Sequence, residues 1–115
     1  MKHEGSCHCG GITFTAQGDI DQAVDCNCSM CRRRGALLWF VPGDAFELTS
    51  PRPQLATYTF NKHRIQHHFC PTCGIAPFGE GTSPDGSRMV AVNVRCLPQV
   101  DLEALKVVRF DGASM

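Results

Sequence analysis

Seven of the eight cysteines in this sequence fall into three short clusters with the spacing of metal ligands. The clusters are Cys7 with Cys9, then Cys26 with Cys28 and Cys31, then Cys70 with Cys73. A chain turn brings such thiolates to within about 4 Å of each other, so that they can share one Zn²⁺ ion at Zn–S distances of about 2.3 Å. Two tetrahedral zinc ions need eight ligands, and the clusters supply seven. Because structural zinc is fully ligated and catalytic zinc keeps one position open, the shortfall suggests one site of each kind.

The clusters can be paired by counting sulfurs. Cys70 and Cys73 form a C-x₂-C knuckle followed by Gly74, and two sulfurs leave a tetrahedral shell half filled. Cys7 and Cys9 supply the second pair, because the middle cluster already offers three sulfurs of its own. We therefore predict a structural zinc on Cys7, Cys9, Cys70 and Cys73. We predict a catalytic zinc on Cys26, Cys28 and Cys31, whose fourth position is left to water, a substrate thiol, or a histidine, aspartate or cysteine from elsewhere in the chain, Cys96 included.

Disulfides are the alternative use of so many cysteines. Eight in 115 residues approach the density of small secreted scaffolds. However, Met1–Ser6 has no apolar signal-peptide segment, and no apolar run is long enough to span a membrane. Thiols stay free in a reducing cytoplasm, where C-x₂-C pairs usually bind metal. We therefore predict a cytoplasmic metal-binding protein.

The charge balance argues against a nucleic-acid partner. The sequence has 11 basic and 11 acidic residues, and seven thiolates holding two Zn²⁺ ions would make the total negative. A nucleic-acid partner normally needs a basic face, so we expect none. The cluster Arg32-Arg33-Arg34 is predicted to be a local countercharge for the neighbouring thiolates. The length fits a single domain spanning residues 1–115.

Hydrophobic alternation predicts strands and almost no helix. Alternating segments lie at residues 12–16, 57–60, 65–69 and 90–94, and Phe46 and Leu48 continue the pattern. Ala36–Val41 is apolar on both faces, which predicts a central strand ended by the Pro42-Gly43-Asp44 turn. Ser83–Gly86 predicts another turn, and Asp101 can cap one helical turn through Leu105. The predicted fold class is mainly β, with stacked antiparallel sheets joined by zinc.

Three segments together resemble a known family. Gly5–Gly11, Cys26–Arg33 and His68–Gly74 are similar in order and motif to the glutathione-dependent formaldehyde-activating enzyme and centromere protein V family. The resemblance implies a β-tent fold, a structural zinc on the C-x-C and C-x₂-C pairs, and a second zinc on the C-x-C-x₂-C segment. It also implies condensation of glutathione with formaldehyde to S-hydroxymethylglutathione, a carbon–sulfur lyase activity. Many relatives have histidine where Asp25 stands here.

Three functions are compatible with these residues. Three thiolates make zinc a weaker Lewis acid than three histidines, and zinc favours the deprotonated form of a bound thiol. We therefore predict an enzyme that adds a glutathione-like thiol to a small aldehyde at the middle cluster. The alternative is a non-catalytic, zinc-stabilised binding or chaperone-like module. A redox enzyme with Cys96 as nucleophile is disfavoured, because Arg95 directly precedes Cys96, whereas B-type methionine sulfoxide reductases have an Arg-aromatic pair before their cysteine.

Other residues near the clusters receive structural interpretations first. Cys96 continues the face of the Val90–Val94 strand, which favours a buried thiol. His67 is in phase with Ile65 and Phe69 and is predicted to be half-buried, whereas His68, close to Cys70, is a candidate to support a ligand. Trp39 and Phe40 are expected in the core, or as one wall of a substrate pocket. Asp25 and Arg32 are polar neighbours of the middle cluster without an assigned role, and the oligomeric state is left open.

Overall fold

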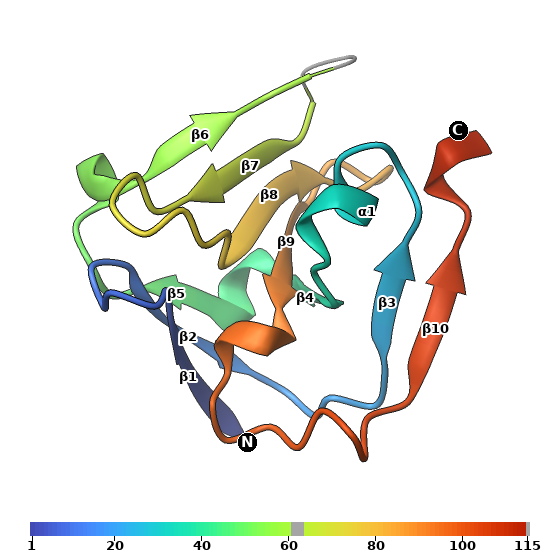
Figure 1. Cartoon of the computed structure of the whole chain (residues 1–115), viewed down its shortest axis with the longest axis horizontal. Coiled ribbons are helices and arrows are strands. Elements are labelled where there is room, and N and C mark those ends of the chain that lie inside the picture. Colours follow the sequence, from blue (N-terminus) through green and yellow to red (C-terminus); the bar gives the residue numbers. More distant parts are fainter. Residues whose placement is uncertain (61–63, 115) are drawn as a thin grey trace.

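The structure is a computed structural model that describes residues 1–60 and 64–114, and it is built from two β-sheets. The smaller sheet has the order β1 (Lys2–Ser6), β2 (Thr13–Gln17) and β5 (Phe46–Leu48). The larger has the order β10 (Val107–Phe110), β3 (Ala23–Cys26), β4 (Leu38–Pro42), β9 (Arg88–Asn93), β8 (Phe78–Thr82), β7 (Gln66–Phe69) and β6 (Ala56–Tyr58). Figure 1 shows the larger sheet curving from β6 to β10, with the short helix α1 (Cys31–Arg34) in front of it.

The predicted mainly β fold class is confirmed. The only α-helix in the described ranges is α1, and the other helical segments are 3₁₀ turns at Gly43–Ala45, Arg52–Gln54, Val94–Cys96 and Gly112–Ser114. The predicted central strand is β4, which lies between β3 and β9 and ends at Pro42. The expectation of purely antiparallel sheets was incomplete, because β10 pairs with β3 in parallel.

Strand β1 has no hydrophobic alternation and was not predicted. Its one buried residue is Gly5, opposite Phe14 of β2. A methyl group built on Gly5 would lie 2.3 Å from the ring of Phe14, so β1 packs with its backbone directly against that ring. The position of this strand therefore depends on the missing side chain of Gly5 rather than on the burial of apolar side chains.

The core lies between the two sheets and contains side chains from both. The rings of Phe14 and Phe46 from the smaller sheet are 5.3 Å apart, and Phe46 lies 4.5 Å from Phe78 of the larger sheet. The strand register places Trp39, Val92, Phe78, His68 and Thr57 in one row across the inner face of the larger sheet. Burial of the aromatic and aliphatic side chains of this core is the main force that holds the sheets together.

The opposite, outer face of the larger sheet carries a second row. Phe40, Ala91, Gly79, His67 and Tyr58 are register partners across five strands. Phe40 and Tyr58 are 51% and 50% exposed. Val24 pairs with Leu38, so Cys26 at the end of β3 faces the same side as Phe40. The middle cysteine cluster and this aromatic row therefore lie on one face of the molecule.

The two aromatic residues proposed as a pocket wall are separated by this arrangement. Trp39 is buried on the inner face, where the ring of His3 lies 5.5 Å away in a T-shaped contact. Strand alternation sends Phe40 to the outer face. Only Phe40 can therefore line a surface that a substrate reaches, and Trp39 belongs to the core.

Glu80 is the centre of a polar network at the edge of the core. Its carboxylate accepts hydrogen bonds from Arg52 at 3.0 Å and from Arg88 at 2.9 Å. It also lies 2.8 Å from Nε2 of buried His68, whose Nδ1 is 2.8 Å from the hydroxyl of Thr57. A neutral imidazole satisfies both contacts by donating from Nε2 and accepting at Nδ1. The pKa of His68 is lowered by burial, against the raising effect of Glu80, which agrees with this neutral form.

We expect Glu80→Gln to lower the free energy of unfolding by about 2 kcal/mol at pH 7, because an amide cannot accept from all these donors. Burial raises the pKa of Glu80, but the hydrogen bonds from Arg88 and Arg52 outweigh it and hold the pKa below its ordinary 4.5. The carboxylate therefore stabilises the fold above pH 4.5, and this contribution is lost as the pH falls through the lowered pKa. Urea unfolding at several pH values measures the difference.

The matched control for this prediction is Glu47→Gln, an exposed acid on β5 without an ion pair in the described part of the chain. It should change stability by less than about 0.5 kcal/mol at any pH. If the difference in the free energy of unfolding between wild type and Glu80→Gln did not shrink in acid, the charge of Glu80 would not be what stabilises the network.

Candidate metal centres

The first and third cysteine clusters lie on two loops of the same form. One loop joins β1 to β2 and the other joins β7 to β8, and the two lie side by side in Figure 1. Each opens with a cysteine whose N–H donates to the carbonyl of an isoleucine five residues later, at 3.0 Å from Cys7 to Ile12 and at 2.9 Å from Cys70 to Ile75. Each turns at a glycine with a positive φ, 81° at Gly10 and 80° at Gly74. A side chain at either position would be strained, which explains the glycine after each pair.

The four sulfurs of these loops converge. The sulfurs of Cys7, Cys9, Cys70 and Cys73 all lie within 4.8 Å of one another. The Sγ atom of Cys9 is 3.7 Å from that of Cys7 and 3.6 Å from that of Cys70. A zinc tetrahedron with bonds of about 2.3 Å has edges of about 3.8 Å, so the four cysteines fit such an ion. All eight cysteines lie in the described residues, and none forms a disulfide.

Backbone N–H groups point at these sulfurs and favour thiolates. The N–H of Ile12 donates to Cys7 Sγ at 3.3 Å. The N–H groups of Ile75 and Cys9 lower the pKa of Cys73 to about 6. Thiolates are the form of cysteine that binds metal, so Cys73 is held in the state a cation needs. The N–H of Gly11 acts to lower the pKa of Cys9, but the neighbouring sulfurs of Cys70 and Cys7 outweigh it and raise this pKa to about 11.

The middle cluster is assembled at the junction of β3 and α1. Cys26 ends β3, Cys28 lies in the following turn, and Cys31 begins α1. Their three sulfurs lie within 4.8 Å of one another, with Cys31 buried and the other two half-buried. Within residues 1–60 and 64–114, no further cysteine, histidine or carboxylate joins this group. The cluster could hold a metal ion with three protein ligands.

The thiols of the middle cluster differ in proton affinity. Burial raises the pKa of Cys31, and the neighbouring Cys28 raises it further. Burial also acts to raise the pKa of Cys28, but the hydrogen bond from the N–H of Cys31 to Cys28 Sγ, at 3.3 Å, and other neighbours outweigh it, so its pKa is lowered. Cys28 is therefore the more easily ionised of the two.

The sequence profile of the glutathione-dependent formaldehyde-activating enzyme family matches residues 2–107. The chain belongs to this family. A crystal structure of a Rhodobacter sphaeroides protein, a structural genomics target, superposes with a TM-score of 0.78. The two chains are 28% identical, and the match covers 94% of this chain and 100% of the other. The family resemblance is thus confirmed.

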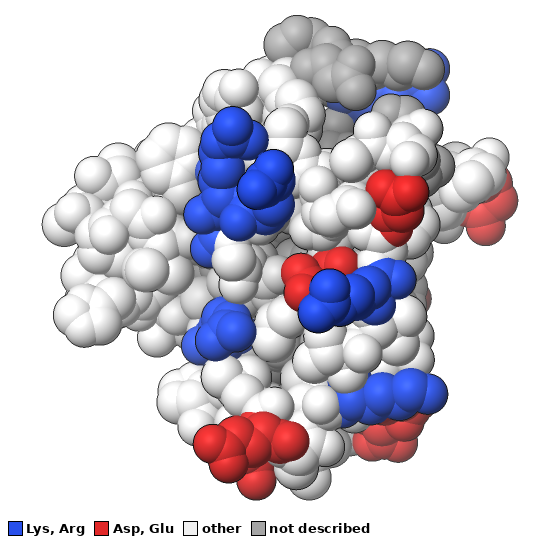
Figure 2. Space-filling view, turned by 45° about the vertical axis from the view of Figure 1, so that its right-hand side comes forward, with Lys and Arg blue, Asp and Glu red and all other residues white. Residues whose placement is uncertain are grey.

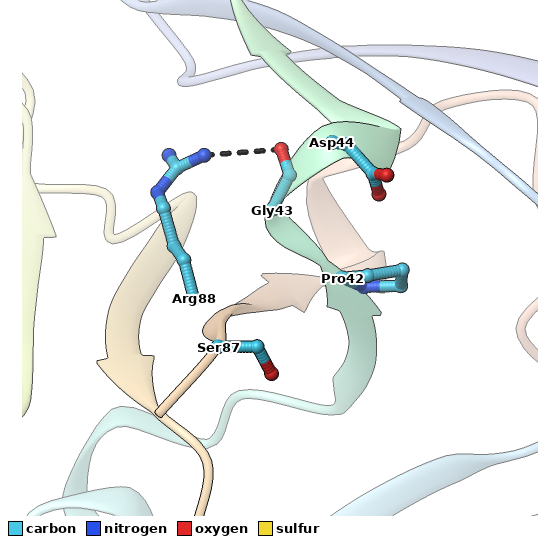
Figure 3. Close-up of a pocket in the computed structure, with 5 residues that line it drawn as sticks. All are labelled: Pro42, Gly43, Asp44, Ser87 and Arg88. Carbon is cyan, nitrogen blue, oxygen red and sulfur yellow. Dashed lines mark hydrogen bonds between the residues drawn. The ribbon is translucent and has the colours of Figure 1, made fainter. Parts of the chain in front are cut away.

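Family membership suggests glutathione and formaldehyde as the substrates to consider. No helix in the described part of the chain has the length and hydrophobicity needed to cross a membrane. The surface hollow in Figure 3 is lined by Pro42, Gly43, Asp44, Ser87 and Arg88. Arg88 already donates there to the carbonyl of Gly43 at 3.0 Å, and no cysteine borders the hollow. The cysteine clusters are therefore the family's candidate site in this chain.

The structure corrects the expectations for the residues beside the clusters. His68, considered as support for a ligand, contacts Thr57 and Glu80 on the inner face instead of a cysteine. His67 is half-buried as predicted, but on the outer face, where its ring stacks 5.3 Å from Phe60. Asp25 is exposed on β3 next to Arg109 in the register and is not part of the metal-ligand group.

Cys96 is buried, as predicted, and lies outside both groups of converging sulfurs. Burial is the main reason that its pKa is raised to about 11, and the charges of Cys7 and Cys73 add to the effect. Its electrostatic neighbours are therefore in the four-cysteine group and not in the middle cluster.

We expect Cys96→Ala to keep the full metal content and to lower the free energy of unfolding by about 1–2 kcal/mol, the cost of a small cavity. Metal analysis and urea unfolding of the same preparation measure the two quantities. Loss of one metal equivalent would instead make Cys96 a ligand, against its place outside both groups of converging sulfurs.

The basic cluster on α1 lies beside the middle sulfurs. The guanidinium of Arg34 is 5.9 Å from the ring centre of Phe69, and Arg33 donates to the carbonyl of Ser29 at 2.6 Å. Desolvation lowers the pKa of Arg34, against the opposing effects of Cys31 and Tyr58. In the described residues, none of the three arginines pairs with a carboxylate. Figure 2 shows a compact group of basic side chains, with acidic and basic groups mixed elsewhere on that face.

Proposed function

We propose that this protein is a zinc-dependent enzyme that adds a glutathione-like thiol to a small aldehyde such as formaldehyde, a reaction of the carbon–sulfur lyase type. The observation that supports it most is the convergence of the Cys26, Cys28 and Cys31 sulfurs without a fourth ligand group in the described residues. We assign a second, structural zinc to Cys7, Cys9, Cys70 and Cys73, which gives two ions per chain. The partners are then small molecules, without nucleic acid or membrane, and the free thiols fit a cytoplasmic location.

A metal at the middle cluster would supply one thing, a lower pKa for a thiol bound beside the three cysteines. A free alkyl thiol has a pKa of about 8.5, so only about 3% of it is ionised at pH 7. Cys26, Cys28 and Cys31 would hold the ion, and their arrangement sets where the substrate sulfur stands. The thiolate attacks the aldehyde carbon and forms the C–S bond, and the resulting alkoxide takes a proton from solvent.

Residues around the cluster suit a thiol that carries negative charge. Arg34 is one helical turn from Cys31, so both residues lie on one side of α1. It has no acidic partner in the described residues, and it interacts electrostatically with both Cys31 and Tyr58. A carboxylate of an anionic thiol such as glutathione would supply the missing countercharge. The exposed rings of Phe40 and Tyr58 extend the same face.

The reaction is tested by exchange NMR of glutathione with ¹³C-labelled formaldehyde, with and without protein that has been shown to hold two zinc ions. Faster interconversion of free formaldehyde and S-hydroxymethylglutathione in the presence of protein is the expected result. If the zinc-loaded protein neither binds glutathione nor accelerates the exchange, the zinc-stabilised binding module becomes the better description of the chain.

A further inference from the structure

The chain segment Asp111–Ser114 lies directly against the middle cysteine cluster. A methyl group built on Gly112 would lie 2.6 Å from Cys26 Sγ and 3.2 Å from Cys28 Cβ. Real side-chain atoms do not approach so closely, so the segment can occupy this position only because residue 112 has no side chain. In Figure 1 the segment is the last turn of the chain, beside the loop that leaves β3.

Asn27, which stands between two of the three cysteines, fixes the segment in place. Its backbone N–H donates to the carbonyl of Phe110 at 3.1 Å. Its side-chain amide donates to Asp111 Oδ1 at 3.1 Å and accepts from the N–H of Ala113 at 2.9 Å. Ser114 in turn donates to Asp111 Oδ2 at 2.7 Å, which closes the turn. One side chain in the metal-binding loop thus uses both its donor and its acceptor to hold the segment.

Strand β10 explains how the segment reaches the cluster. Its parallel pairing with β3 places Phe110 beside Cys26, so the chain leaves β10 at the level of the first sulfur. The family profile ends at residue 107, before this segment begins. The covering of the cluster is therefore a feature of this chain that family membership does not imply.

We propose that Asp111–Ser114 forms a wall that limits access to the Cys26 side of the cluster, with Asn27 as the residue that positions it and Gly112 as the residue that determines how closely it sits. Groups that approach the sulfurs from this side are then selected by size. The proposal about access stands on the packing alone, and its extension to substrate thiols rests on the proposed function.

The test measures how fast each cysteine of the purified, metal-containing protein is alkylated, by peptide mass spectrometry. Iodoacetamide is the small reagent and a dye-labelled maleimide the bulky one. In Asn27→Ala, alkylation of Cys26 by the maleimide should rise about tenfold or more, because two hydrogen bonds that hold an exposed segment are gone. The rise with iodoacetamide should be smaller, and Gly112→Ala, which forces the segment outward, should act in the same direction.

Two controls separate the wall from general destabilisation. Ser29→Ala changes the same loop at a side chain that forms no hydrogen bond with the segment among the described residues, and it should leave all rates unchanged. Two other cysteines report on opening elsewhere in each variant. They are Cys96, which is buried in the core, and Cys73, which belongs to the four-cysteine centre. Asn27→Asp should behave like Asn27→Ala, because it sets two carboxylates against each other. Adding Asp111→Asn restores a donor opposite the new carboxylate and should return the rates toward wild type.

Unchanged Cys26 rates in Asn27→Ala would overturn the proposal. An equal rise at Cys26, Cys73 and Cys96, with no dependence on reagent size, would overturn it as well, because it would show that Asn27 only stabilises the fold. The ratio of the Cys26 alkylation rates in the variant and in wild type tests the wall directly. It does not depend on glutathione addition, so failure of the proposed reaction would not obscure the result.

Discussion

Replacing Cys70 with serine is expected to release the metal of the four-cysteine centre and to unfold the chain. The two loops that meet there belong to different sheets, and Cys7 and Cys70 are buried where this centre joins the hydrophobic core. Metal bound only in the folded state contributes its binding free energy to folding, about 10–16 kcal/mol for structural zinc peptides. That is comparable with the whole stability of a typical domain, about 5–15 kcal/mol.

The measurements are zinc content and circular dichroism of Cys70→Ser, with Cys28→Ser as the matched control. Cys28→Ser should lose one metal equivalent and keep its secondary structure, because β3 and α1 are joined directly and do not depend on the ion for their proximity. Equal damage in both variants would show that the two centres do not divide into a structural and a catalytic one.

The second large effect is expected in the reaction. Cys28→Ser should reduce the protein-dependent rate of S-hydroxymethylglutathione formation at pH 7 by about 30-fold or more. The factor follows from ionisation alone, because a free thiol with a pKa of about 8.5 is about 3% thiolate at this pH. Any gain from orientation would add to it. Cys96→Ala, which changes a cysteine outside both groups, should retain the rate.

The pH dependence of the same rates distinguishes thiol activation from other causes. The advantage of wild type over Cys28→Ser should shrink as the pH rises past about 8.5, where glutathione ionises without help. An advantage that is constant with pH would mean that the cluster does not act by deprotonating a thiol. NMR exchange at pH 6, 7, 8 and 9 is sufficient to decide.

The grouping of the cysteines was predictable because each cluster is local in the sequence. Ligands two or three residues apart are brought together by any turn, and counting sulfurs was enough to match Cys7 and Cys9 with Cys70 and Cys73. Strands with alternating apolar residues, such as that containing Phe14 and Ala16, were predictable for the same reason.

The features of the fold that were not predicted depend on contacts between segments far apart in the sequence. Strand β1 is buried through Gly5, which carries no apolar signal, and β10 is paired at a sheet edge with largely exposed residues. The role of His68 was misjudged because it stands close to Cys70 in the sequence, whereas its partner Glu80 lies twelve residues away. Nothing in the residues around Gly112 predicts its contact with Cys26, since a close backbone approach has no motif.

The four-cysteine centre also has a consequence for the order in which the chain assembles. Its two loops belong to different sheets, and the Cys9–Cys70 contact spans 61 residues. Closing so long a loop is entropically costly, and folds dominated by distant contacts form slowly. If an ion bound both loops early in folding, its binding free energy would offset the entropic cost of this closure. The folding rate would then depend on the concentration of free zinc. The ion would then act on the folding pathway itself, as the element that first brings the two sheets within reach of each other.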